Sequence, residues 1–105
     1  MNNERRKRIS LADTQLDHCK GAQDYSDVLS ELQEILDDET EAFENMPEGL
    51  QYSERGEASQ EAQEYLEEAI DGLENVINLF DAEDMDTDQL GDLIDEIHES
   101  LTSIY

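Results

Sequence analysis

The chain has 105 residues, with 30 acidic residues against 6 lysines and arginines, a net charge of −24 and a mean hydropathy of −0.80. This length allows one ordinary domain, and this charge argues against direct binding of nucleic acids or anionic membranes, because their phosphates would repel the protein. The single cysteine, Cys19, excludes an internal disulfide bond and fits a reducing compartment. Because neither a signal peptide nor an apolar run of transmembrane length is recognisable, we expect a cytoplasmic protein.

The N-terminus differs in charge from the rest of the chain. Four of the six basic residues lie together, in the segment Arg5–Arg8. We interpret residues 1–8 as a basic tail that either folds back on the acidic remainder or stays mobile. From Ile9 onward, 29 acidic residues stand against only two basic residues, so residues 9–105 carry −27. We expect these residues to form a single acidic helical domain.

Residues 10–44 are predicted to form the first helix, since their apolar residues recur every three or four positions. The pattern is regular from Asp27 to Glu44. Upstream, the apolar residues recur strictly every three positions, which drifts around an α-helix, and Gly21 lies in this stretch. Either one long helix changes its packing partner there, or the helix breaks between Gly21 and Asp24; we favour the single long helix.

A turn and a second helix follow. Pro47, Gly49 and Gly56 mark residues 45–56 as the turn. Residues 54–80 are predicted to form an amphipathic helix, because nearly all of their apolar residues fall on one stripe.

The third helix is predicted at residues 87–104, with Asp86 or Thr87 as its N-cap and Gln89 placed to close a capping box. The link at residues 81–85 is short enough to make the last two helices antiparallel neighbours. The expected fold class is therefore all-α: a three-helix antiparallel bundle, or a helical hairpin with a long first helix. A long first helix would leave apolar length uncovered, so we also expect a homodimer formed through a helical bundle or coiled coil.

The acidic residues are placed where they lower helix stability. Exposed helix faces normally mix Glu with Lys, whereas like charges four positions apart cost about 0.2–0.5 kcal/mol per pair. Such a systematic penalty indicates a functional demand for acidity. The alternative is that the acidity serves only solubility or a high-salt environment. The second helix contains three pairs of acidic residues that lie four positions apart: Glu57 with Glu61, Glu64 with Glu68, and Glu67 with Asp71.

The charge density is comparable to that of duplex DNA. A helix over residues 10–44 would be about 52 Å long at about 1.5 Å per residue. Spreading 29 carboxylates over this length gives one charge per about 1.8 Å, against about 1.7 Å for duplex DNA. This charge density would allow the protein to mimic a nucleic acid.

A calcium loop is the nearest match to a metal site. Asp84, Asp86 and Asp88 occupy the first three ligand positions of an EF-hand loop. However, Gln89 stands where the loop needs glycine, and Asp95 where it needs glutamate. We interpret the segment as a capped helix start, and we expect no metal or other cofactor.

No combination of residues predicts catalysis. His18 and Cys19 are adjacent, and adjacent helical residues point in different directions, so they do not form a nucleophile–base pair. We interpret Cys19 as a small core residue and His98 as a boundary residue of the last helix. Because the sequence contains no phosphate-binding loop, Cys/His cluster or Ser-His-Asp set, we expect a non-enzyme.

Two stretches, residues 44–57 and 65–74, resemble a group of small acidic helical proteins from phages, prophages and mobile elements of Gram-positive bacteria. The specific part is the turn PEGLQYSERGE at residues 47–57. This resemblance implies no activity and no site residues. In charge and size the chain is also similar to phage-encoded DNA mimics that block restriction or CRISPR nucleases.

Together these features predict an inhibitor that uses its acidic helices to block a basic nucleic-acid-binding site in the host cytoplasm, for example in a CRISPR or restriction nuclease. The alternative is a structural or assembly protein of a phage or mobile element, whose acidity serves only solubility. A divalent-cation-responsive module is a third possibility. The residues expected to contact the partner are the acidic residues of the second helix and one aromatic residue of the turn: Glu57, Glu61, Glu64, Glu67, Glu68, Asp71, Glu74 and Tyr52.

Overall fold

The computed structural model describes residues 2–81 and 86–104, and every regular element within them is a helix. This confirms the all-α fold class. In chain order the helices are α1 (Asn3–Leu16), α2 (Ala22–Glu44), α3 (Glu48–Gln51), α4 (Glu54–Asp81) and α5 (Thr87–Thr102).

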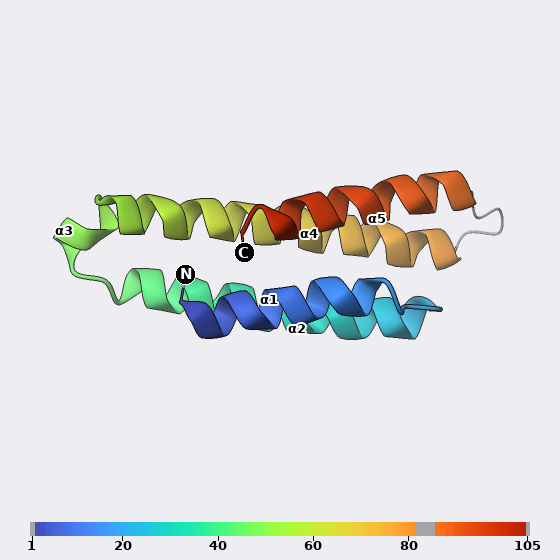
Figure 1. Cartoon of the computed structure of the whole chain (residues 1–105), viewed down its shortest axis with the longest axis horizontal. Helices are drawn as coiled ribbons and strands as arrows, with labels where there is room; N and C mark the ends of the chain where they lie inside the picture. Colours follow the sequence, from blue (N-terminus) through green and yellow to red (C-terminus); the bar gives the residue numbers. More distant parts are fainter. Residues whose placement is uncertain (1, 82–85, 105) are drawn as a thin grey trace.

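The four longer helices form an elongated antiparallel bundle (Figure 1). The long helices α2 and α4 pack along each other, α1 packs on α2, α5 packs on α4, and α1 also contacts α5. The resulting rod measures 51 × 19 × 18 Å over its Cα atoms. Helix α1 begins and α5 ends part-way along the rod, so the end of the rod that is closed by α3 consists mainly of α2 and α4 (Figure 1).

All four long helices contribute to one continuous apolar core. Their apolar residues recur every three or four positions, so each helix presents one apolar stripe to its neighbours. The stripes are therefore covered within a single chain. The largest fully buried apolar side chains are Ile9, Leu16, Leu32, Ile35, Leu66, Leu73, Ile97 and Leu101.

The prediction of one long helix over residues 10–44 is wrong. Helix α1 ends at Leu16, α2 begins at Ala22, and the chain reverses direction between them (Figure 1). The reversal lets α1 bury Ile9 and Leu16 against other helices, whereas a straight helix would leave them in water. In the turn, the Lys20 amide donates a hydrogen bond to the Asp24 carboxylate at 2.9 Å, just before the first turn of α2.

The basic segment is also more ordered than a tail. Residues 3–8 form the first turns of α1, and the side chain of Asn2 caps this helix by accepting a hydrogen bond from the Arg5 amide at 2.8 Å. The basic segment does fold back on the acidic remainder, as one of the two predicted alternatives stated, but it does this as part of a helix.

The turn before α4 contains the single-turn helix α3, which the sequence did not predict. The Gln51 side-chain amide donates to the carbonyl oxygens of Phe43 and Met46, both at 3.2 Å, and so closes the end of α2. Gly56 is required at the start of α4, because a Cβ there would lie 2.0 Å from the Gln51 carbonyl oxygen.

Helices α4 and α5 begin and end within two residues of the predicted helices at 54–80 and 87–104. The predicted cap at Asp86 is confirmed, since its carboxylate accepts from the amides of Asp88 at 2.9 Å and Gln89 at 3.3 Å. Residues 82–85 of the predicted link lie outside the described residues.

We expect Gly72→Ala to destabilise the bundle by about 1–2 kcal/mol. A Cβ at Gly72 would lie 2.7 Å from Cγ1 of the buried Ile97 on α5, so this overpacking outweighs the helix propensity of alanine. The matched control is Gly91→Ala on α5, where a Cβ meets nothing within 4 Å. This substitution should raise the free energy of unfolding by about 0.5–1 kcal/mol. Urea unfolding measures both; equal stabilisation by the two substitutions would contradict the close contact between α4 and α5.

Candidate acidic interaction surface

Helix α2 places several of its acidic residues next to arginines of α1. The Arg8 guanidinium donates to Glu31 at 3.1 Å and to Asp38 at 2.6 Å. The hydrogen bond to Asp38 is the main reason why the pKa of Arg8 is raised above its ordinary value. The charge of α2 is thus partly neutralised within the molecule.

A second arginine reaches a buried acid. Glu39 on α2 is 1% exposed, and its carboxylate accepts from Arg5 Nε at 2.6 Å and from Ser59 Oγ on α4 at 2.7 Å. Burial alone would raise the pKa of Glu39, but the hydrogen bonds from Ser59 and Arg5 outweigh burial and hold it below its ordinary value. This cluster joins α1, α2 and α4.

The imidazole of His98 joins α5 to α1. Its Nδ1 contacts the Asp13 carboxylate, and its Nε2 lies 3.0 Å from the Asp17 carboxylate. His98 is half-buried at the edge of the bundle, as expected of a boundary residue. The sequence did not predict its partners, because they lie more than 80 residues away along the chain.

The remaining acidic surface belongs to α4 and α5. Helix α4 carries nine acidic residues and one basic residue, Arg55, while α5 carries five acidic residues and no lysine or arginine. Among the residues that the structure describes, none of these 14 carboxylates forms an ion pair. We call the solvent-facing side of these two helices the α4–α5 surface.

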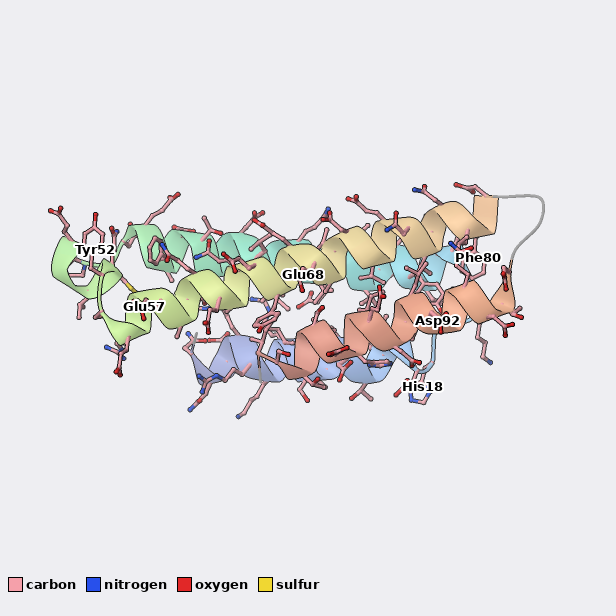
Figure 2. All side chains as sticks on the ribbon, turned by 90° about the horizontal axis from the view of Figure 1, so that it is seen from above. His18, Tyr52, Glu57, Glu68, Phe80 and Asp92 are labelled. Carbon is pink, nitrogen blue, oxygen red and sulfur yellow. The ribbon has the colours of Figure 1, made fainter. Side chains whose placement is uncertain are left out.

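The structure exposes all of the residues expected to contact a partner. Figure 2 places Tyr52 at the α3 end of the rod, Glu57 and Glu68 along α4, and Asp92 on α5. Tyr52 is 80% exposed. The main row of acidic residues follows one face of α4 and comprises Glu57, Glu61, Glu64, Glu68 and Asp71. By helical spacing, Glu67 and Glu74 form a second row beside it.

A hollow of about 530 Å³ lies over the seam between α4 and α5. Gly72 and Ile97, which are in close contact across the seam, both line it. Tyr65 and Leu93 line it as well, and both are half-buried. Four exposed carboxylates also line it: Glu68, Asp71, Glu96 and Glu99. Glu68 and Asp71 are among the residues predicted to contact a partner, whereas Glu96 and Glu99 are not.

The mean number of these carboxylates per unit length is close to that of the phosphates in one nucleic-acid strand. Helix α4 has 28 residues and is therefore about 42 Å long. Its nine acidic residues and the five of α5 give one carboxylate per about 3 Å of this length, against about 3.4 Å per phosphate in one DNA strand. Over the whole 51 Å rod, the net charge of −24 gives one charge per about 2 Å, against about 1.7 Å for the duplex.

The other sequence predictions concern chemistry. Cys19 is only half-buried; its thiol donates to the Gln15 carbonyl oxygen at 3.3 Å, and burial is the main reason why its pKa is raised. Of the calcium-like segment, Asp84 lies outside the described residues, while Asp86 and Asp88 form the cap and first turn of α5. Within residues 2–81 and 86–104, no group of three or more His, Cys, Asp or Glu side chains is placed to hold a metal ion.

None of the helices in the described part of the chain combines the length and apolar content needed to span a bilayer. No family model, curated protein or solved structure matches this chain.

Proposed function

We propose that this protein binds the basic, nucleic-acid-binding surface of another protein through the α4–α5 surface and thereby keeps nucleic acid away from it. One observation carries the proposal: 14 carboxylates lie on two adjacent helices, and none of them pairs with a cation in the described structure. Lysines and arginines of a partner would supply the missing cations.

The contrast between the two halves of the bundle supports this choice of surface. On α2, Arg5 pairs with Glu39 and Arg8 with Glu31 and Asp38, which lowers the repulsion along part of this helix. On α4 and α5 the repulsion remains, and the stability lost through it is recovered when a basic partner binds. Complementary charge also speeds association and favours basic partners over others.

The nature of the partner follows from the resemblance noted in the sequence. The turn at residues 47–57 resembles small acidic phage and mobile-element proteins, and the charge and size are similar to phage DNA mimics. We therefore propose a host-defence nuclease of the restriction or CRISPR type as the partner. The hollow between α4 and α5 would accept an arginine side chain, since its half-buried residues include Tyr65 and it is lined by carboxylates.

A pull-down tests the proposal. The protein is immobilised and exposed to a lysate of a Gram-positive bacterium at low salt, and bound proteins are eluted with duplex DNA. We expect the eluted proteins to be nucleic-acid-binding proteins that also bind this protein when purified. Bound proteins that DNA does not displace would contradict the mimicry, and a lack of binding to any purified DNA-binding nuclease would contradict the proposed partner class.

The alternative of an assembly protein draws less support from the fold. It required apolar stripes to pair two chains, but these stripes are covered within one chain. Among the described residues, the exposed large apolar side chains are Leu11, Leu50 and Tyr52. The break between α1 and α2 also removes the reason for expecting a dimer, namely a long uncovered first helix.

A further inference from the structure

A second cavity, of about 460 Å³, lies where the start of α1 meets the end of α2 and the start of α4. Three of the six lysines and arginines of the chain line it, two from α1 and one from α4. This convergence brings together residues about 50 positions apart in the sequence. The lining residues are Asn2, Arg5, Arg6, Glu39, Met46, Arg55 and Ala58.

The cavity is positively charged in an otherwise acidic protein. Its lining holds three arginines against the single carboxylate of Glu39, which Arg5 already engages through Nε. Arg6 and Arg55 are exposed, and within the described residues neither forms an ion pair, although acidic residues outnumber basic ones five to one. The positive end of the α1 dipole adds to this charge.

We propose that this cavity binds a small phosphate monoester. Guanidinium groups hold phosphate oxygens through paired hydrogen bonds, and a dianion balances the net charge of the lining. The volume lies within the usual range for small-molecule sites, about 300–1,000 Å³, and exceeds the need of a bare phosphate. Met46 and Ala58 supply apolar surface for the organic part of the ligand.

The overall charge of −24 does not prevent this binding. At physiological salt, charges separated by more than about 8 Å are largely screened, so the local lining decides the sign that a ligand meets. None of the 14 carboxylates of α4 and α5 lines this cavity, so phosphate binding can be tested separately from the proposed function.

Calorimetry and amide chemical shifts test the site on the full chain, with adenosine monophosphate, inorganic phosphate and adenosine as probes. We expect adenosine monophosphate to bind saturably and to shift the amides of Arg6 and Ala58. Inorganic phosphate should compete for the same site, and adenosine should not bind. Saturable binding of adenosine alone, or no saturable binding of either phosphate, would overturn the proposal.

Charge-matched variants separate the site from general attraction. Arg6→Gln and Arg55→Gln should each weaken binding of adenosine monophosphate by about tenfold or more. Lys7→Gln removes the same charge from an exposed position of α1 that does not line the cavity, and it should weaken binding less than threefold. Equal losses for all three variants would overturn the site. Thermal unfolding of each variant checks that the bundle is retained.

Discussion

Replacing Arg5 with methionine is expected to destabilise the bundle by about 2–4 kcal/mol. The reason is the burial of Glu39, whose side chain is 1% exposed and whose carboxylate accepts from Arg5 at 2.6 Å. In the variant this carboxylate keeps the hydrogen bond from Ser59 but loses a charged partner inside the protein. A small domain has only about 5–15 kcal/mol of stability, so urea unfolding would show a clear loss.

Two further variants identify the cause of this loss. Lys7→Met removes the same charge from an exposed position of α1 and should change stability by less than about 0.5 kcal/mol. The double variant Arg5→Met/Glu39→Met replaces the pair with apolar side chains and should recover most of the loss. A double variant as unstable as Arg5→Met alone would show that Arg5 acts through packing and not through Glu39.

The same cluster predicts a dependence on pH. Because the pKa of Glu39 is lower in the folded state, its contribution is fully present above the ordinary glutamate pKa. The contribution is lost as the pH falls through the lower, folded-state pKa. The stability difference between the native chain and Glu39→Gln should therefore shrink below about pH 4, while effects of the other carboxylates cancel in the difference. A difference that does not change with pH would contradict a charged Glu39.

The second prediction concerns the α4–α5 surface. Neutralising Glu57, Glu61 and Glu64 to glutamine should weaken binding to a basic, nucleic-acid-binding partner by about 10–100-fold, since each lost surface contact contributes about 0.5–1 kcal/mol. The bundle itself should become slightly more stable, because repulsion along α4 is relieved. Titration calorimetry and urea unfolding measure the two opposite effects.

Helix α2 offers a matched control, with acidic residues at the same spacing. The variant Asp37→Asn/Glu41→Gln/Glu44→Gln changes the net charge equally, and these exposed residues form no ion pair within the described structure. We expect it to gain similar stability and to lose less than threefold in affinity. Equal losses of affinity would mean that binding follows net charge and not the α4–α5 surface.

Periodicity predicted the helices that stand alone as amphipathic segments. The stripes of α4 and α5 are unbroken, and the cap at Asp86 marks a boundary, so both helices were placed within two residues. A single long helix was favoured over a break near Gly21 because apolar residues continue across this stretch at a spacing of three. Gly21 was the available signal, but local sequence does not show that folding back buries Ile9 and Leu16.

The candidate surface was predictable only in part. The exposure of Glu57 and Glu68 followed from their position opposite the apolar stripe of α4. The hollow beside them did not, because residues of both α4 and α5 line it and the sequence does not show how these two helices pack. The ion pairs of Arg5 and Arg8 likewise join residues 23–34 positions apart, which periodicity does not reveal. These pairs nevertheless decide which acidic residues remain without a cation.

The central claim is that the acidity of this protein is a binding device, and salt tests it most directly. The affinity for a purified nucleic-acid-binding partner is measured by calorimetry from about 50 mM to about 200 mM NaCl. Charge-driven binding predicts at least about a tenfold loss of affinity over this range. An affinity that stays constant over the same range would contradict the claim and would leave the acidity as a means of staying soluble.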